Sequence, residues 1–291
     1  MDYGLVLPSL GDEANLAGIE AAIDLAARHG LTDIWVTDHI LVGHEAADDY
    51  GRIYEAVTTL AWAAARNPTL RLGASVIVVP MREAVLLAKQ LATVDALSRG
   101  RLIAGFGVGW NRDEFANVAA VERFEVRGAY LEETINLCRH LWSGSTEPFR
   151  GRFVMFEDFV FGPLPDQGAA LPIWIGARDE RALRRVGRLA DGYHSSATSP
   201  SGYAPRVPII RAAAEAAGRP MPRLSARVRV ELGAGPESFF TLHGSAEDVA
   251  AGIREYGALG VDHLAVAFAP GDAAGLEEAI ERFVAEVRPI V

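Results

Sequence analysis

The chain has 291 residues, a formal net charge of −10 and 50% hydrophobic residues. This balance is typical of a globular enzyme with a core that needs no disulfide or structural metal. The negative charge argues against nucleic acid or an anionic membrane as a partner, because both favour a basic surface. No apolar stretch reaches the ~18 residues of a membrane span and no signal peptide is evident, so we expect a soluble, cytoplasmic protein.

Short β-rich runs alternate with amphipathic helical patterns along the whole chain. In chain order, the patterns predict strands at 3–7, 33–37, 70–79, 102–107, 173–175, 192–195, 225–232 and 263–267. Helices are predicted at 15–29, 55–66, 84–97, 128–142, 180–187, 203–217, 246–259 and 276–287. The run at 70–79 is almost unbroken in its apolar character, which is typical of a strand buried on both faces of a parallel sheet.

Residues 143–171 interrupt this alternation with a stretch rich in glycine, proline and aromatic residues. It contains FRGRFVMF and DFVFG, which are predicted to pair as a hairpin, and its phenylalanines are expected to pack on the barrel rim. Eight strand–helix units predict an α/β fold, a (β/α)8 TIM barrel with an insertion between strands 4 and 5. We expect one domain over 1–291. A Rossmann fold is disfavoured because no glycine fingerprint follows the first strand.

Cysteine and histidine spacing excludes some kinds of site. The single cysteine, Cys138, cannot form an internal disulfide, and its helical apolar pattern favours a buried side chain over a nucleophile. His140 and His263 fall within or beside regular elements, where a structural role is favoured. No cluster has metal-ligand spacing and no GxSxG sequence occurs, so no metal site is expected.

In a barrel of this kind the active site lies at the C-terminal ends of the strands. The second strand ends in Asp38 and His39, and an aspartate beside a histidine can orient or tune the imidazole for proton transfer near neutral pH. The alternative is that Asp38 only accepts hydrogen bonds from loop amides and that His39 lies at the surface.

Glycines occupy alternate positions at the end of the fourth strand: Gly105, Gly107 and Gly109. Missing side chains on one strand face allow close approach of a flat ring or of backbone. Tight packing within the protein is the alternative explanation.

A second small-residue loop, Gly176-Ala177-Arg178, precedes a predicted helix. Free amides and the positive end of the helix dipole at such a place suit a phosphate group. Asp179 and Glu180 at the same helix start compete with an anion.

Several segments are similar to the luciferase-like monooxygenase superfamily, and most similar to its branch of deazaflavin-dependent oxidoreductases. They are DIWVTDHI, a long middle stretch that includes LGASV, LATVDALSRGR and GFGVGW, then RGAYLEETINLCRHLW, PIWIGARDERALRRVGRLADGYHSSA and GSAEDVAAGIREYGALGVDHLAVAF. These segments cover most of the chain in the family's order. The resemblance implies a (β/α)8 barrel with an insertion, usually a homodimer, that binds coenzyme F420 (8-hydroxy-5-deazaflavin) or FMN in the barrel mouth.

The resemblance also implies where the ring system lies. Asp38 and His39 match the residues beside the ring, and a non-proline cis peptide that supports it from behind maps onto Ser75–Val76. The loops after strands four, five and six contact the ring and the phosphate tail. Their matching residues are Gly107, Gly109, Trp110, Gly176, Ala177, Arg178 and His194.

One position departs from the family pattern. Some deazaflavin dehydrogenases have a catalytic glutamate directly after the strand-four glycines, and here that position is Trp110. Tryptophan cannot exchange protons. The departure therefore argues against sugar-phosphate dehydrogenation and leaves His39 as the acid or base.

Three functions follow from these features. The leading hypothesis is hydride transfer between coenzyme F420 and a small organic substrate, with His39 delivering or stabilising a proton. The second is an FMNH2-dependent monooxygenase in which Trp110 shields the flavin from water. A non-catalytic flavin-binding barrel is the third, and the intact Asp38-His39 pair disfavours it. In this family the loops at 42–54 and 149–161 set the substrate.

Overall fold

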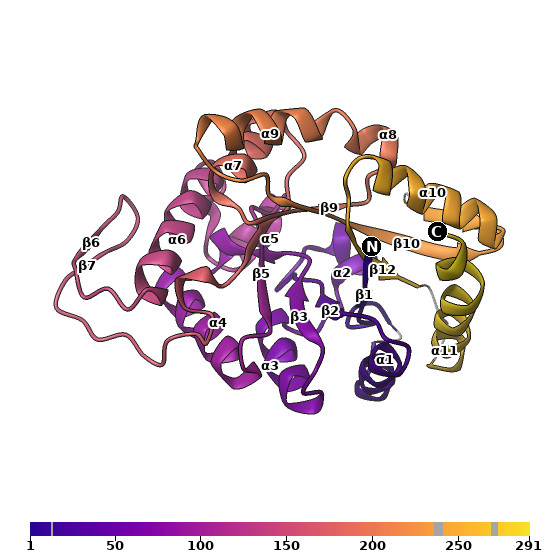
Figure 1. The fold of residues 1–291 in the computed structure, drawn as a ribbon. Helices are drawn as coiled ribbons and strands as arrows, with labels where there is room; N and C mark the ends of the chain where they lie inside the picture. The colour runs from indigo at the N-terminus through magenta and orange to yellow at the C-terminus, as the bar shows by residue number, and fades with distance from the viewer. Residues whose placement is uncertain (13, 236–240, 269–272) are drawn as a thin grey trace.

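The computed structural model describes residues 1–12, 14–235, 241–268 and 273–291. Within them, eight parallel strands close into a barrel surrounded by helices (Figure 1). In order around the barrel these strands are β1 (Asp2–Val6), β2 (Asp33–Val36), β3 (Arg71–Ala74), β5 (Leu102–Gly107), β8 (Ile173–Ile175), β9 (Gly192–Ser196), β10 (Arg223–Leu232) and β12 (His263–Ala267). Pairing of β12 with β1 closes the ring. The predicted (β/α)8 barrel is confirmed.

An outer layer of helices covers the strands (Figure 1). Its longer members are α1 (Leu16–Arg28), α3 (Ala56–Arg66), α4 (Ala84–Ser98), α6 (Arg127–Trp142), α7 (Glu180–Leu189), α9 (Arg206–Ala216), α10 (Ala246–Ala258) and α11 (Ala273–Arg282). Local sequence explains their starts: Asn15 accepts a hydrogen bond from the Gly18 amide at α1, and Ser245 with Asp248 forms a capping box at α10. Across the described segments, none of the helices combines the length and apolar character that crossing a bilayer requires.

The apolar run at 70–79 is not one strand. β3 ends at Ala74, a short strand β4 (Ile77–Val78) pairs with β5, and the Ser75–Val76 peptide between them is cis. The cis bond implied by the family resemblance is therefore confirmed, whereas the continuous strand is wrong. An apolar pattern reports burial, and it carries no information about a backbone break at a buried position.

The hairpin between α6 and β8 differs from the predicted one. Its strands β6 (Phe149–Arg150) and β7 (Met155–Phe156) both lie within FRGRFVMF, so the predicted pairing with DFVFG is wrong. The Glu133 carboxylate of α6 accepts hydrogen bonds from three amides of the connecting turn, which stabilises this shorter register. The hairpin lies outside the helix layer (Figure 1).

The phenylalanines of this segment pack on helices rather than on the barrel rim. Phe149, Phe156 and Phe159 surround His140 of α6, and Phe153 meets Tyr130 edge-on. The rim interpretation was wrong because apolar spacing shows that a side chain is covered but not which element covers it.

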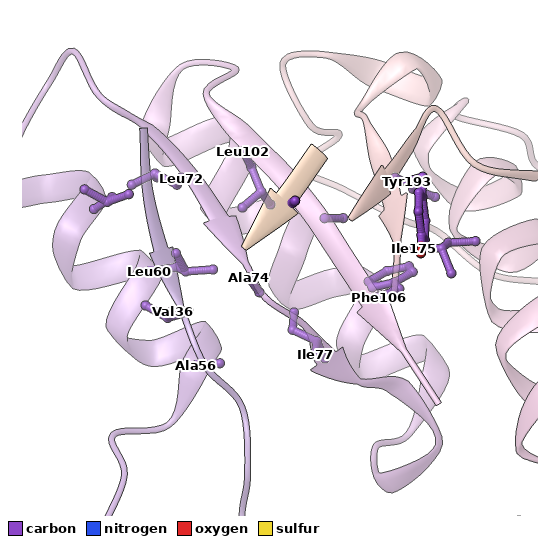
Figure 2. Packing of buried hydrophobic residues seen from close by; sticks show 14 of the residues in the cluster. Val36, Ala56, Leu60, Leu72, Ala74, Ile77, Leu102, Phe106, Ile175 and Tyr193 are labelled. Atoms are coloured by element: carbon purple, nitrogen blue, oxygen red, sulfur yellow. The ribbon is translucent and has the colours of Figure 1, made fainter. Parts of the chain in front are cut away.

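The main core lies between the strands and the helices. Figure 2 shows Leu60 of α3 beside Leu72 and Val36, and Ile175 with Tyr193 farther along the same layer. Cys138 is completely buried in this core, and burial raises the pKa of its thiol, so the predicted apolar role is confirmed.

The barrel interior is filled by flat rings. Trp35 and Trp174 form a small cluster there with Val6, Ile103 and Ala265, and their indoles contact His194 and His263. Glycines on neighbouring strands make this possible: a Cβ on Gly73 or on Gly192 would lie 2.5 Å from the facing indole. This ring layer lies directly beneath the C-terminal ends of the strands.

Candidate active site

Polar side chains gather just past the ends of β2 and β3 and at the middle of the long strand β10, level with the end of β9. Because residues alternate between the two faces of a strand, Thr37, Ser75 and Arg227 all face the barrel axis. Arg227 Nη1 donates to Thr37 Oγ1 at 2.9 Å and, at 3.4 Å, to the carbonyl oxygen of Ser75. No carboxylate in the described part of the chain pairs with this guanidinium, and burial lowers its pKa. The mouth therefore holds a cation with capacity for an anionic or electron-rich group.

The chemically most distinctive pair is His39 with Glu114. Nδ1 of His39 lies 2.7 Å from one carboxylate oxygen of Glu114, and the other oxygen accepts the Ile40 amide at 2.6 Å. His39 is 7% exposed and Glu114 is fully buried. Burial acts to raise the pKa of Glu114, but the hydrogen bonds from His39 and Ile40 outweigh it and the pKa lies below its ordinary value. An ionised carboxylate thus fixes the proton on Nδ1.

The second nitrogen of His39, Nε2, has no hydrogen-bond partner within the described segments. Its surroundings are aromatic. The Tyr50 ring of the short helix α2 (Ala47–Tyr50) lies 4.1 Å from the imidazole between ring centroids, and the Trp110 ring lies at 6.2 Å. Trp110 is 61% exposed. His39 can therefore exchange a proton at Nε2 beside an apolar wall.

Asp38 does not contact His39. Both of its carboxylate oxygens accept from the Arg82 guanidinium, at 2.7 and 2.8 Å, and one also accepts the Val78 amide at 2.8 Å. The predicted Asp38–His39 pair is therefore wrong, because neighbouring residues of an extended chain point in opposite directions. Asp38 instead anchors β4, the segment that follows the cis peptide.

Trp110 directly follows the strand-four glycines, and sequence reasoning did not single out the glutamate farther along the chain. Glu114 provides the carboxylate from α5 (Arg112–Asn117), four residues beyond Trp110. Asn111 caps this helix by accepting the Asp113 and Glu114 amides. The sequence Asn111-x-x-Glu114 has the spacing of a helix start, and it was the available signal for an acidic side chain placed over the mouth.

The strand-four glycines serve the protein's own packing. A Cβ on Gly105 would lie 1.7 Å from the Ala74 carbonyl oxygen, and one on Gly107 would lie 2.3 Å from a methyl group of Val76. Gly109 has a φ of +73° and a Cβ there would meet Val78 at 2.6 Å. These distances favour the tight-packing explanation, in which the glycines make room for the chain around the cis peptide.

Arg178, in the loop before α7, and Arg206, at the start of α9, both lie near Tyr193. Arg206 donates to the Tyr193 hydroxyl at 2.9 Å and to the Ala177 carbonyl at 3.4 Å, and Arg178 is close enough to act on the pKa of the same phenol. Neither guanidinium has a carboxylate partner among residues the structure describes. Asp179 caps α7 through the Ala182 amide. The arginines, more than the capped helix end, suit an anionic group.

His194 lies beneath the mouth and is 1% exposed. Its Nε2 is 2.8 Å from Ser75 Oγ, and its ring stacks on Trp35 with centroids 4.5 Å apart. It therefore meets the mouth only through Ser75. A surface hollow of about 250 Å³ lies elsewhere, along β10 and α11, and none of the predicted site residues lines it.

Comparison with known proteins identifies the family. The sequence profile described as luciferase-like monooxygenase matches residues 1–238. The chain belongs to the luciferase-like monooxygenase family.

The chain is also similar to proteins named as F420-dependent glucose-6-phosphate dehydrogenases. The chain is 29% identical over 212 residues to an F420-dependent glucose-6-phosphate dehydrogenase of Kineococcus radiotolerans, and the match covers 71% of this chain and 61% of that protein. A protein of the same description from Amycolatopsis mediterranei is 31% identical over 214 residues, with 70% and 61% covered. The matched segment thus spans less than two thirds of the length of either relative.

Solved structures share the fold. An F420-dependent secondary alcohol dehydrogenase in complex with an F420-acetone adduct superposes with a TM-score of 0.83 at 16% identity, covering 100% of this chain and 99% of that one. The F420-dependent tetrahydromethanopterin reductase of Methanopyrus kandleri gives 0.80 at 19% identity, with 99% and 98% covered. At these identities the likeness shows the barrel alone.

Proposed function

We propose that this protein is a deazaflavin-dependent oxidoreductase that transfers hydride between coenzyme F420 and a small organic substrate at the barrel mouth. The observation that carries the proposal is the His39–Glu114 pair. One imidazole nitrogen is held by an ionised carboxylate, and the other is available beside Tyr50 and Trp110. The relatives named as F420-dependent dehydrogenases support the choice of coenzyme.

The donor groups at the mouth fit a flat heterocycle with carbonyl groups. Ser75 and Val76 would support the ring, and Arg227 with Thr37 would meet its electron-rich edge. Arg178 and Ala177, together with Arg206, would hold the phosphate tail. Gly176, which follows β8, completes the proposed set, and Gly107 and Gly109 would contribute by making room for the chain that supports the ring. When bound, coenzyme F420 supplies a carbon that accepts or gives hydride.

The protein's own contribution is proton handling and exclusion of water. When His39 Nε2 takes a proton from a substrate hydroxyl, the imidazole becomes cationic, and the Glu114 carboxylate at 2.7 Å stabilises that charge. In the opposite direction the same nitrogen returns the proton. Tyr50 and Trp110 cover the imidazole from the solvent side. Asp38 takes no part in this step and holds β4 in place through Arg82.

An FMN-dependent monooxygenase is the second candidate. The family match and the exposed Trp110 favour it, because such an enzyme needs an apolar cover that keeps water from the flavin. Titration of the apo protein with F420 and with FMN, followed by fluorescence, separates the two. Binding of F420 supports our first choice, and binding of FMN alone contradicts it. If neither binds, a degenerate barrel without catalytic function is left.

A pair of arginine variants tests the proposed role of Arg227 in coenzyme binding. We expect Arg227→Met to weaken binding of the preferred coenzyme about tenfold, the size of one charged hydrogen bond. Arg184→Met, which removes an exposed arginine paired with Glu180 on α7, is the matched control and should leave binding unchanged.

We also propose that residues 1–291 form one domain, that the protein is a homodimer, and that it works in the cytoplasm. Limited proteolysis should yield no stable smaller fragment. Light scattering should give twice the chain mass of 31.2 kDa. Fractionation of the source cells tests the location.

A further inference from the structure

A chain of hydrogen bonds runs through the barrel interior from the mouth to the opposite end. Ser75 Oγ is 2.8 Å from His194 Nε2, and His194 Nδ1 is 2.8 Å from Ser225 Oγ. Ser225 Oγ is 2.7 Å from His263 Nδ1, and His263 Nε2 is 2.9 Å from Asp33 Oδ1. Five strand regions contribute one residue each, and none of these residues is more than 7% exposed.

Asp33 gives this chain a direction. Its carboxylate also accepts from the Thr32 hydroxyl and from the Trp35 indole. Burial acts to raise the pKa of Asp33, but the hydrogen bond from His263 and the other donors outweigh it, so the pKa lies below its ordinary value. An ionised carboxylate only accepts hydrogen bonds. His263 must therefore present a hydrogen on Nε2 to Asp33.

The remaining hydrogens follow from the number of protons that each group carries. At a pH where His263 carries one proton, at Nε2, its Nδ1 accepts from the Ser225 hydroxyl. The Ser225 oxygen then accepts from His194 Nδ1. Burial holds the pKa of His194 well below its ordinary value, with the Arg227 charge adding to the effect, so this imidazole is neutral and its Nε2 accepts from Ser75. Every hydrogen in the chain points toward Asp33.

We propose that Asp33, His263, Ser225 and His194 are positioning residues that turn the Ser75 hydroxyl inward, so that Ser75 presents only oxygen lone pairs to a ligand at the barrel mouth. This inference rests on the proposed function, because Ser75 matters to the reaction only if a ring binds beside it. A ring N–H would be accepted there, and a ring carbonyl would be repelled.

Packing supports a fixed arrangement of these groups. The Trp35 ring stacks on His194 with an interplanar angle of 7°, while its own N–H donates to Asp33. A Cβ on Gly4 would lie 1.9 Å from Asp33 Oδ1, so β1 leaves room for the carboxylate only because it has glycine there. The chain is thus held by rings and backbone on both sides.

Ser225→Ala breaks the chain at its centre, and Ser195→Ala provides a matched control. Ser195 lies on β9 and is 1% exposed, as deeply buried as Ser225 at 0%. Its hydroxyl has no hydrogen-bond partner within the described residues. Both variants remove one buried hydroxyl, but only Ser225→Ala disconnects His194 from His263.

The first measurement is the proton position on each imidazole, from long-range ¹H–¹⁵N spectra of apo protein labelled at histidine, at pH 8. We expect His194 to carry its proton on Nδ1 and His263 on Nε2. In Ser225→Ala the His194 nitrogens should shift toward a mixture of the two tautomers, whereas Ser195→Ala should match the wild type. A wild-type His194 proton on Nε2, or no shift in Ser225→Ala, would overturn the proposal.

The second measurement links the chain to the reaction. Ser225→Ala should lower turnover about tenfold, the size of one lost buried hydrogen bond, with coenzyme affinity little changed, and Ser195→Ala should do neither. Wild-type turnover in Ser225→Ala would overturn the positioning role. Because the spectra need no coenzyme, failure of the proposed function leaves the first measurement valid and is recognised separately by the coenzyme titration.

Discussion

In the described part of the barrel, two histidine–carboxylate pairs have nearly the same local geometry. His39 and Glu114 are 2.7 Å apart at the mouth, and His263 and Asp33 are 2.9 Å apart in the interior. They differ at the second imidazole nitrogen. Nε2 of His39 has no partner among the residues described, whereas Nδ1 of His263 is bonded to Ser225. Of these two imidazoles, only that of His39 has a ring nitrogen available to a ligand.

The surroundings of the two pairs also differ, because His39 lies near exposed residues and His263 is enclosed. His39 faces Tyr50 and the exposed Trp110, which lie in the segments that follow β2 and β5. His263 is enclosed by the indoles of Trp35 and Trp174. One residue pairing can therefore serve proton exchange in one place and internal order in another. The comparison teaches that position in the barrel, more than the pairing itself, decides its role.

The largest expected effect is on turnover at the mouth. Because His39 is the proposed acid and base, His39→Ala should lower the turnover number about 10²- to 10⁴-fold, with little change in coenzyme affinity. Steady-state rates and a fluorescence titration check both quantities. His140→Ala, at a half-buried histidine of α6 bonded to the Glu147 carbonyl, should leave both unchanged. An unchanged rate in His39→Ala would remove His39 from catalysis.

The second largest expected effect is that of the His263–Asp33 pair on the free energy of unfolding. Asp33→Asn removes a buried charge that three donors satisfy, and we expect the free energy of unfolding to fall by about 3 kcal/mol at pH 7. Denaturant unfolding measures this loss. A loss below about 1 kcal/mol would contradict the idea that Asp33 anchors the interior.

The same pair predicts a pH dependence. The pKa of Asp33 is lower in the folded protein than the ordinary value of 3.8. Its carboxylate therefore contributes stability at pH values above 3.8, and this contribution is lost as the pH falls through the lower folded value. The difference in unfolding free energy between wild type and Asp33→Asn should be constant near neutral pH and shrink in acid. A difference that grows in acid would contradict this assignment.

Glu114→Gln tests the other carboxylate with a smaller expected effect. Glutamine can still accept the Ile40 amide, but it cannot balance the charge of a cationic His39. We expect turnover to fall about 10- to 100-fold, as for the loss of one charged hydrogen bond. Rates measured across pH, with circular dichroism as the check on folding, separate this effect from misfolding. A wild-type rate would show that Glu114 only holds the loop.

The smallest expected effect is on the stability of Trp110→Ala. Trp110 is 61% exposed, so its removal should change the free energy of unfolding by no more than about 0.5 kcal/mol. Because Trp110 is proposed to lie beside the substrate, we nevertheless expect Trp110→Ala to have a higher KM for the substrate than the wild type. If Trp110→Ala lowered the free energy of unfolding as much as it lowered the free energy of substrate binding, Trp110 would have a structural role and no role in substrate binding.

The parts of the site that sequence reasoning found are those set by local position. His39 and Ser75 follow the ends of strands, and the barrel rule places such residues at the mouth. The pairing of His39 with Glu114 joins residues 75 positions apart, and Arg82 holds Asp38 from 44 positions away. Contacts of that kind depend on how α5 and the segment after β4 fold back over the strands.

Arg227 was missed although the sequence RVRVEL contains a signal for it. In a barrel the apolar residues of a strand face the helices, so the alternating arginines of β10 must face inward. The alternation was interpreted only as a strand. Its consequence, an arginine at the mouth, becomes evident once the closed barrel fixes which side is the interior.

The sequence by itself determined the alternation of eight strands with helices, the burial of Cys138 and the location of His39 at a strand end, because periodicity and turn residues act over a few positions. Only the tertiary structure decided which carboxylate meets which imidazole. Side chains from distant strands converge inside a closed barrel, and their partners follow from register and strand tilt. The direction of the interior hydrogen-bond chain is therefore a property of the folded barrel.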